Sequence, residues 1–427
     1  MKKLFILVAI LSCIFLISPK FIGGIVETEY ETALNKLNEN PAITVKSTVF
    51  NRQWYKGQVV TEMTVLLHNE KINELNIVIK DDISFGPIIF TDEGVKFALS
   101  YSESTINFID SFISEEVEAF IQNSIHVSAL LTFEKNIITH ITIDEVSREV
   151  DGNNVVSAKA VGKFVLENEN RLYGDFNWDG LSAKTQDDNF IIEAVKFSLD
   201  QTLISGSYYQ GNAISTGNFN FLISSIQSKD AAGNTEFSLD NLTMNAKSSV
   251  NNNLMKVEMN YSVDKLASAG QKIKNANLDL VLNDLNIIVM QEINALLTKS
   301  SNGDDEVFST ENMKQLSVLT AKLLASDPTI EIEDFSVETP EGKFESAMKI
   351  SADKNLFDSA NFMSIIPAIN ATAEGKAPMS VFTKLGLAPM VEYYIEQGFI
   401  IKTEDKISFN ANFVKGQLSL NGNVISL

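Results

Sequence analysis

The chain of 427 residues is acidic, with 55 Asp and Glu against 34 Lys and Arg and a net charge of −21. Such a surface repels phosphate backbones and anionic headgroups, which argues against nucleic-acid binding. A hydrophobic content of 44% excludes global disorder, and eight prolines are too few for long rigid linkers.

The first 26 residues predict an export signal. Lys2 and Lys3 precede an apolar run from Leu4 to Ile17 that is broken only by Ser12, a second apolar patch covers Phe21–Val26, and acidic residues follow. Lysines before an apolar run and acids after it predict a cytoplasmic N-terminus and an exported body. We therefore expect residues 1–26 to be a signal anchor and residues 27–427 to be the exported domain.

The length of the leader favours an uncleaved anchor. Leu4–Ile17 would span roughly 21 Å as a helix, which is short of the roughly 30 Å hydrocarbon core of a bilayer. Continuation through Val26 makes the helix long enough, provided that Lys20 snorkels to the interface and Pro19 is tolerated. Because no Ala-x-Ala-like cleavage site is present, retention is the favoured fate, but the sequence leaves cleavage open.

Cys13 offers another fate for the leader. Ile10-Leu11-Ser12-Cys13 loosely resembles a lipoprotein box, in which Cys13 would be lipidated, although Leu11 is bulky for such a box. A small apolar residue inside a membrane helix is the favoured interpretation. Since this is the only cysteine, the body from Glu27 onward has no intrachain disulfide and depends on core burial for its stability.

Alternating apolar and polar residues predict a mainly β body with a few helices. Met255–Val263, Leu278–Leu282 and Ile407–Phe413 alternate residue by residue. One polar face per strand indicates an elongated antiparallel sheet or meander with a solvated side, behind one N-terminal membrane helix. Similar segments are Ile43–Phe50, Val59–Leu67, Leu75–Lys80, Val127–Phe133, Ile137–Ile143, Phe190–Leu199, Phe219–Ile223 and Phe344–Ile350.

Three segments break the alternation. In Leu239–Leu242, Leu282–Leu285 and Ile332–Phe335, two apolar residues flank a polar pair. Strict alternation would put the two apolar residues on opposite faces, so we expect a bulge or tight turn that brings both inward.

Helical spacing of apolar residues predicts helices at four places. These are Thr105–Gln122, the region Met290–Leu297, the region Met313–Leu324 with a cap at Ser309-Thr310 and a stop at Asp327-Pro328, and Pro378–Gln397 with an interruption at Pro389 and a stop at Gly398. The exported body exceeds the usual size of one domain. Two packed units with a boundary near residues 283–328, or one elongated sheet, both fit this length.

Catalytic motifs are absent from the sequence: it contains no P-loop, no G-x-S-x-G and no H-E-x-x-H. His68, His126 and His140 show no metal-ligand spacing. His140 and Asp144 share one strand face and could pair, but a solvent-exposed polar face is the favoured interpretation.

The remaining polar and aromatic clusters have ordinary explanations. Asp187-Asp188 and Asp304-Asp305-Glu306 could bind calcium, but neither follows a known ligand spacing, so we interpret them as solvated loop acids. Trp54-Tyr55 predicts a turn with a core or interface aromatic ahead of the next strand. We therefore expect no catalytic, cofactor-binding or metal residues, no cofactor and no enzymatic activity.

Short motifs spread along the chain carry a family resemblance. They are Phe21-Ile22-Gly23-Gly24, Glu29–Asn38, Tyr55-Lys56-Gly57, Phe85-Gly86-Pro87, Asp327–Ile332, Gly342–Ser346 and Lys415–Gly422. The chain resembles the YdgA-like family of bacterial inner-membrane proteins, which carry a domain of unknown function. Relatives typically have His-Gly-Pro where this chain has Phe85-Gly86-Pro87, so any chemistry of that histidine is absent here. The resemblance implies an inner-membrane anchor with the bulk of the chain in the periplasm, and no established activity.

Two functions follow as hypotheses. In the first, a non-enzymatic cell-envelope protein binds a hydrophobic ligand such as a lipid, or an envelope partner, on one-face-apolar strands that leave an apolar trough partly open. In the second, the apolar faces close into a core and the sheet is a scaffold for interactions. An envelope hydrolase is the weakest alternative, because no nucleophile–base arrangement is visible.

Overall fold

The computed structural model shows a mainly β protein with few helices, which confirms the predicted fold at this level. It describes residues 2–67, 74–109, 122–150, 153–185, 188–268, 270–301 and 310–425, with the main chain alone at 2–15, 48–49, 150, 153, 297–301 and 310–311. Within these residues, 22 strands belong to one sheet, and β4 (Ile88–Thr91) and β5 (Gly94–Phe97) form a separate antiparallel pair. Every strand segment that the alternation predicts overlaps an observed strand.

The chain divides into two compact units. Unit 1 consists of Met1–Val146, Ser157–Trp178 and Ser198–Ile214, and unit 2 consists of Ser147–Val156, Asp179–Phe197 and Ser215–Leu427. Three long strands contribute residues to both units: β12 (Arg171–Lys184), β13 (Asp188–Ser205) and β14 (Ile214–Asp230). Residues 283–328, where the sequence suggests a boundary, lie within unit 2.

Unit 1 is an antiparallel ladder in which most neighbours are successive along the chain. Its strands are β1 (Ile43–Arg52), β2 (Lys56–Leu66), β3 (Glu74–Phe85), β6 (Ser100–Phe108), β7 (Ile125–Leu131), β8 (Ile137–Ile143), β11 (Ala160–Glu167) and the first part of β12. Each strand in this list pairs with the next one. Two short strands, β9 (Val146–Val150) and β10 (Asn153–Ser157), pair with each other.

Helix α1 (Lys2–Leu37) runs through Pro19 and packs its later turns on the unit 1 sheet. Ile22 and Val26 on α1 are buried together with Ile83 and Phe85 of β3. The period of these apolar residues along α1 matches one helix face, so burial of that face holds the helix on the strands.

Gly23 and Gly24 allow α1 to approach the sheet closely. A Cβ atom on Gly23 would lie 2.9 Å from Cε2 of Phe85, and one on Gly24 would lie 2.8 Å from Nη1 of Arg52. Arg52 forms an ion pair with Glu27 at 3.0 Å, one turn further along the helix. The paired glycines therefore leave room for the Phe85 ring and the Arg52 side chain.

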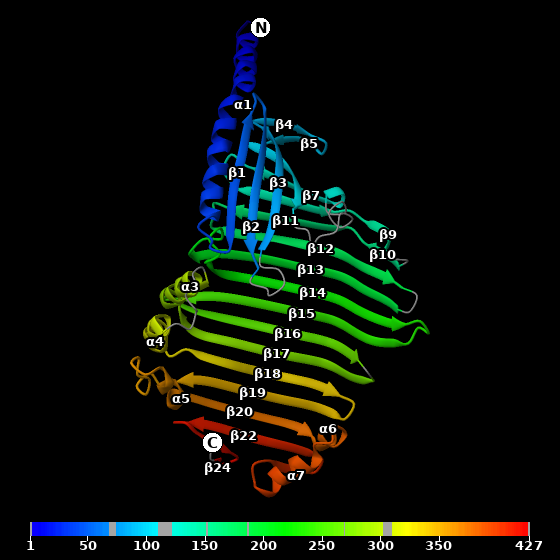
Figure 1. Cartoon of the computed structure of the whole chain (residues 1–427), viewed down its shortest axis with the longest axis vertical. Helices are drawn as coiled ribbons and strands as arrows, with labels where there is room; N and C mark the ends of the chain where they lie inside the picture. Colours follow the sequence, from blue (N-terminus) through cyan, green and yellow to red (C-terminus); the bar gives the residue numbers. More distant parts are fainter. Residues whose placement is uncertain are drawn as a thin grey trace. The chain divides into compact units, whose positions relative to one another are not determined.

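Unit 2 continues as a second antiparallel ladder (Figure 1). The strands of this ladder are β14 from Ser215 onward, β15 (Thr235–Asn251), β16 (Leu254–Ser268), β17 (Gln271–Asn286), β18 (Thr329–Thr339), β19 (Gly342–Ala352), β20 (Ile369–Pro378), β22 (Lys406–Val414), β23 (Gln417–Leu420) and β24 (Asn423–Ile425). Each pairs with the next, and β21 (Ile401–Thr403) pairs with β22. Long strands that follow one another in sequence indicate a meander.

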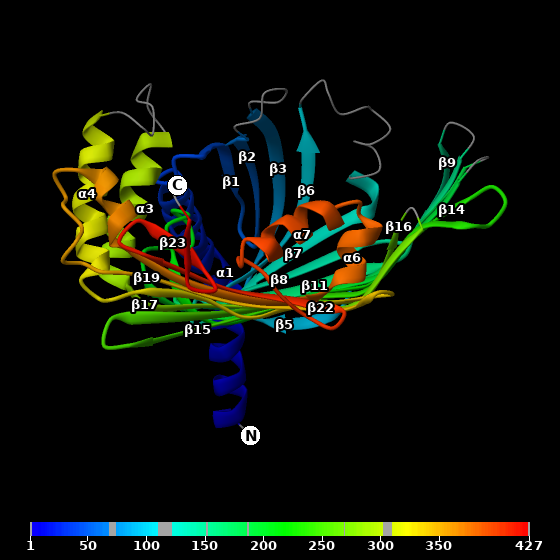
Figure 2. The same cartoon turned by 90° about the horizontal axis from the view of Figure 1, so that it is seen from below.

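The helices of unit 2 lie at opposite ends of these strands. Helices α3 (Ile287–Ser301) and α4 (Thr310–Leu324) connect β17 to β18, whereas α6 (Met379–Lys384) and α7 (Ala388–Glu396) follow β20. A short 3₁₀ turn, η1 (Phe362–Ser364), and α5 (Ile365–Ala368) precede β20. Figure 2 shows both helix pairs on the same side of the unit 2 strands.

The helix predictions are partly correct. Helices α3 and α4 confirm two of them, although the predicted cap at Ser309-Thr310 lies outside the described side chains. In the predicted helix Thr105–Gln122, residues 105–108 belong to β6, which corrects its start, and residues 110–121 lie outside the description. Alternation in Ser102–Phe108 continues the ladder, and pairing with β3 prevails over helical spacing.

Helices α6 and α7 confirm the predicted helical region Pro378–Gln397 and its interruption, but the break does not lie at Pro389. Proline stands in the first turn of α7, where its missing N–H costs no hydrogen bond, and the break falls at Leu385–Leu387 around Gly386, whose φ is 73°. The stop at Gly398 is confirmed, since its φ is 77° and its N–H donates to Ile395 O.

Among the residues that the structure describes, no helix is long and apolar enough to cross a membrane. The predicted span within residues 1–26 therefore has no support from the structure, and most of its apolar run lies where side chains are not described.

Candidate functional site

The apolar residues of unit 2 form continuous rows across one face of its sheet. Tyr261 of β16 pairs with Met244 and Leu278, and Leu278 pairs with Phe335 of β18. We call this surface the open apolar face. Its members in the middle of the strands are Phe221, Met244, Val257, Met259, Tyr261, Leu278, Leu280, Leu282, Ile330, Ile332, Phe335, Met348 and Ile350.

Bulges keep these rows on one face, as the sequence predicts for two segments. The register shifts between Ile332 and Phe335, which both pair with residues on the same face of β19. A second shift lies opposite Leu282–Leu285, where Asp284 has a φ of 55°. In Leu239–Leu242 the predicted bulge is absent: the register is continuous, and Asn241 adopts a φ of 50° instead.

Burial on this face is confined to its two ends. The middle residues are half-buried, and Ile330 and Phe335 are 43% and 41% exposed. The buried residues near α3 and α4 are Met255, Ile287, Val289, Leu319 and Leu324, and those near α6 and α7 are Ala377, Met379, Val391 and Ile407. The helices thus cover the ends of the strands and leave the middle of the face uncovered within the described chain.

The size of this face exceeds that of a scattered surface patch. It extends across the six strands from β14 to β19, which at about 4.8 Å per step corresponds to roughly 24 Å. Monomeric soluble proteins rarely leave contiguous apolar surface larger than a few hundred Å² uncovered. The uncovered rows therefore indicate a binding surface.

The opposite face of the same strands is polar and hydrogen-bonded. Asn260 donates to Asp279 at 2.6 Å and to Asn277 at 2.7 Å, and Asn277 donates to Asp334 at 2.9 Å. Amide donors between the carboxylates offset the repulsion of Asp279 and Asp334, which lie opposite each other. The polar side chains of this face thus have hydrogen-bond partners, as expected for a face in contact with water.

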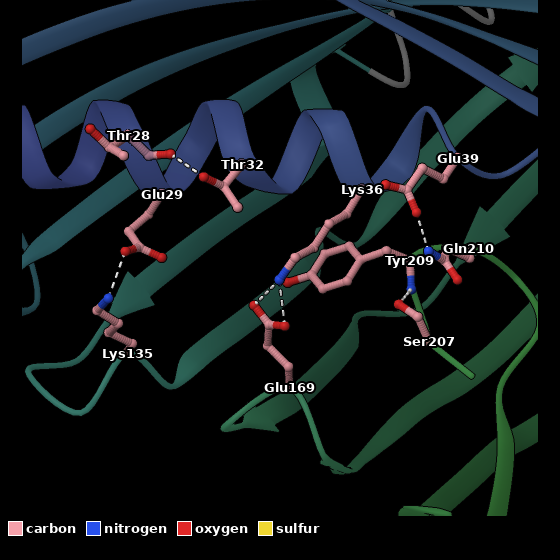
Figure 3. A network of polar contacts seen from close by, with 10 residues as sticks. All are labelled: Thr28, Glu29, Thr32, Lys36, Glu39, Lys135, Glu169, Ser207, Tyr209 and Gln210. Atoms are coloured by element: carbon pink, nitrogen blue, oxygen red, sulfur yellow. Dashed lines mark hydrogen bonds and ion pairs between the residues drawn. The ribbon is translucent and has the colours of Figure 1, made fainter. Parts of the chain in front are cut away.

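Unit 1 contains a small pocket beside α1, with a volume of about 250 Å³ (Figure 3). Two ion pairs border it: Lys36 Nζ lies 2.6 Å from Glu169, and Lys135 Nζ lies 2.7 Å from Glu29. The Lys36 ammonium also lies 5.7 Å from the ring centre of Tyr209. These contacts attach α1 to the β7–β8 and β11–β12 turns.

The charged groups around this pocket form ion pairs that hold α1 against the neighbouring turns. Burial, and secondarily the charges of Glu169 and Glu29, raise the pKa of Tyr209, which keeps the phenol neutral. Lys36 and Glu29 each have an opposite charge within ion-pair distance. Glu39 accepts a further hydrogen bond from Gln210 in the same loop as Tyr209. We interpret this pocket as the place where ion pairs and hydrogen bonds attach α1 to the rest of unit 1.

A second cavity in unit 1, of about 440 Å³, lies on the sheet face formed by alternate residues of β2, β3 and β6. Its lining includes Asp82, Glu103 and Lys56, together with Phe90 and Asp92 of the β4–β5 hairpin. Within the described ranges, no group of three His, Cys, Asp or Glu side chains could hold a metal ion.

The structure separates the residues that the sequence offers for acid–base work. Asp144 lies just after β8 and its carboxylate is 3.0 Å from Nε2 of His126, so the pairing considered with His140 is not the one observed. His140 is exposed, and its partial desolvation and the charge of Lys163 lower its pKa. Both histidines lie on exposed polar surface, as the sequence indicates.

Other sequence candidates fall outside the described parts. His68, Asp187 and Asp304-Asp305-Glu306 are not described, and Cys13 is described by its main chain alone. Trp54 and Tyr55 do form a turn, but they are 50% and 60% exposed, which excludes a place in the core.

Sequence reasoning missed a buried polar cluster beneath α1. Tyr30 lies within hydrogen-bond distance of Thr61 and Asp81, which are 2% and 8% exposed. The available signal was Asp81 at an inward position of the β3 alternation, between Ile79 and Ile83. A polar residue at such a position requires a buried partner.

A family model described as a bacterial protein of unknown function (DUF945) matches residues 1–427. No curated protein matches the chain.

Proposed function

The chain belongs over its full length to the DUF945 family of bacterial proteins of unknown function, and from that premise we propose that it binds lipid acyl chains on the open apolar face of unit 2. It is a non-enzymatic cell-envelope protein held at the inner membrane, with its bulk in the periplasm. The resemblance to YdgA-like proteins supports this location.

The half-buried middle of the open apolar face is the observation that carries the proposal. Side chains such as Leu278 and Met259 alternate strictly with polar neighbours, yet no helix of the described chain covers them. Binding of an apolar ligand is favoured by about 0.8 kcal/mol for each CH₂ group that it buries, whereas a polar ligand has no comparable gain in binding free energy on this surface. A lipid tail therefore fits this surface best.

The dimensions also suit an acyl chain. One tail occupies half of a bilayer core of about 30 Å, which is about 15 Å. The rows extend for roughly 24 Å across six strands, so the face accommodates a whole tail in one orientation.

The scaffold alternative requires closed apolar faces. Helix α4 packs at one end of the unit 2 strands, and Ile330 and Phe335 remain exposed. A hydrolase is supported less, since Asp144 pairs with His126 and not with His140. Both remain outcomes of the experiment below.

Site-specific photocrosslinking in bacterial cells tests the proposal on the full chain. A photoreactive phenylalanine analogue replaces Leu280 on the open apolar face or, as the control, exposed Lys247 on the polar face of β15. We expect phospholipid adducts, detected by mass spectrometry, at position 280 and not at position 247. Protein adducts alone at position 280 would favour the scaffold.

A charge substitution provides the second measurement. Phe221→Asp puts a carboxylate on the open apolar face, whereas Asn220→Asp puts one on the opposite face of the same strand. We expect the first variant to lose most of the lipid adduct and the second to retain it, because desolvating a carboxylate is costly. Equal adduct yields would contradict lipid binding at this face.

A further inference from the structure

Exposed aromatic side chains gather at one end of unit 1. Trp54 and Tyr55 in the β1–β2 turn are 50% and 60% exposed, and Phe21 on α1 is 70% exposed. Large aromatic residues normally bury their rings, so an exposed group of them requires a reason.

The β4–β5 hairpin adds a wholly apolar outer face. Phe90 pairs with Val95 and Ile88 pairs with Phe97, so these four side chains lie on one side of the hairpin. Phe90, Val95 and Phe97 are 79%, 50% and 68% exposed, whereas Ile89 on the other side is 2% exposed. One side of the hairpin thus packs on the protein and the other presents apolar groups outward.

Contacts place these elements beside one another. The indole Nε1 of Trp54 donates to Leu16 O of α1 at 2.8 Å, and the Lys20 ammonium lies 5.4 Å from the Trp54 ring. The β1–β2 turn and Phe90 line the same cavity of about 440 Å³. Figures 1 and 2 both show the hairpin next to the end of unit 1 from which the first turns of α1 project. We call Phe21, Trp54, Tyr55, Phe90, Val95 and Phe97 the aromatic collar.

We propose that the aromatic collar docks unit 1 on the interfacial region of a zwitterionic lipid bilayer. Trp and Tyr combine an apolar ring with a polar group and prefer the headgroup level of a membrane. Phe and Val side chains on the hairpin supply apolar area that the shallow acyl region accepts.

The charges around the aromatic collar and the direction of α1 both favour a lipid bilayer as the partner of this surface. Lys20 and Lys56 are exposed around the collar, and basic side chains with apolar stems reach phosphate groups from such positions. Helix α1 continues from the collar toward the apolar run Leu4–Ile17. The net charge of −21 repels strongly anionic surfaces, which selects zwitterionic lipid. Docking at the interface needs no helix that crosses the bilayer, and it does not depend on lipid binding by unit 2.

Trp54 provides the readout. The chain contains two tryptophans, Trp54 and Trp178, so the Trp178→Phe full chain reports Trp54 alone and the Trp54→Phe chain supplies the signal of Trp178. Each is mixed with phosphatidylcholine vesicles that carry a spin-label quencher either near the headgroup or deep in the acyl chain. We expect Trp54 emission to move to shorter wavelength, to be quenched mainly by the shallow label, and to become protected from iodide. Vesicle-bound protein whose Trp54 remains fully accessible to iodide would overturn the proposal.

Hairpin variants separate the collar from the leader. Phe90→Ser with Phe97→Ser should lower the vesicle partition coefficient at least about tenfold, because most of the exposed hairpin area is lost. Phe133→Ser, at a residue that is 50% exposed in the β7–β8 turn, is the matched control and should bind as the unmodified chain does. An equal loss in the control would overturn the proposal. Protection of Trp54 that depends on protein concentration without vesicles would also overturn it, in favour of a second copy of the chain.

Discussion

The hydroxyl of Tyr30 on α1 donates a 2.8 Å hydrogen bond to Oδ2 of Asp81 in the unit 1 sheet. Ser104 donates to the other carboxylate oxygen at 2.5 Å, and Thr61 lies 2.7 Å from the Tyr30 hydroxyl. These hydroxyl donors supply the hydrogen bonds that a buried carboxylate requires. One polar contact thus fixes how α1 sits over the strands.

Removal of the Tyr30 hydroxyl should destabilise unit 1. We expect Tyr30→Phe to lower the free energy of unfolding by about 1.5–3 kcal/mol, the usual cost of losing a hydrogen bond to a charged group. The ring contact with Phe50 remains available to phenylalanine. Both tryptophans lie in unit 1, so their fluorescence in a urea titration measures this unit.

Tyr101→Phe is the matched control for that measurement, because the acid that the Tyr101 hydroxyl contacts, Glu103 at 3.3 Å, is exposed. We expect a change within about 0.5 kcal/mol. A loss as large as that of Tyr30→Phe would show that the effect is not specific to the buried carboxylate.

Alkaline pH should weaken unit 1 through the same contact. Burial and the charge of Asp81 raise the pKa of Tyr30 above its ordinary value of 10.0. Since the folded pKa is the higher one, the stabilisation is complete below pH 10 and is lost as the pH rises above it. Urea midpoints from about pH 9 to pH 11.5 should therefore fall more steeply for the unmodified chain than for Tyr30→Phe. Identical slopes would be inconsistent with this expectation.

Close packing of α1 depends on Gly23. We expect Gly23→Leu to cost about 2–3 kcal/mol, because even its Cβ would lie 2.9 Å from the Phe85 ring and 3.1 Å from Cδ of Arg52. Glu31→Leu, at an exposed position of the same helix, controls for the added leucine. Tryptophan fluorescence in urea distinguishes the two variants, and an equal, small effect would mean that α1 can shift without cost.

The ion pair between Lys36 and Glu169 should contribute little to the free energy of unfolding by itself. These side chains are 34% and 53% exposed, so we expect Lys36→Met to cost at most about 1 kcal/mol despite the 2.6 Å distance. The loss should shrink further at high salt. A double-mutant cycle with Glu169→Gln measures the coupling, and a salt-independent value above 2 kcal/mol would require a different origin.

The alternation of apolar residues was sufficient to locate many of the strands, although β6, β11, β12 and β20 are not among the predicted segments. Ile137–Ile143 coincides with β8, and Met255–Val263 lies inside β16. A period of two places every second side chain on one face. The same pattern therefore indicates the strand, its apolar face and the register that keeps the apolar side chains on that face. The polar pairs in Leu282–Leu285 and Ile332–Phe335 predicted bulges for the same reason.

Local spacing failed where strand pairing prevails over it. Ile106 and Ile109 have helical spacing, but the backbone of residues 105–108 pairs with β3 and forms the end of β6. Pro389 was expected to break a helix, yet it stands at a position that tolerates proline. Both errors arise because a short apolar pattern does not specify which backbone partners are within reach.

By itself, the sequence determined the β class, the positions and sidedness of many strands and the acidic surface, since these follow from residue period and composition. Tertiary structure alone decided which separate segments meet. Tyr30 and Asp81 are 51 residues apart, and Trp54 and the β4–β5 hairpin join α1 only after folding. Whether an apolar face is covered also depends on where helices such as α4 pack. Long-range contacts of this kind leave no periodic signal in the chain, because they depend on register and packing summed over the whole sheet.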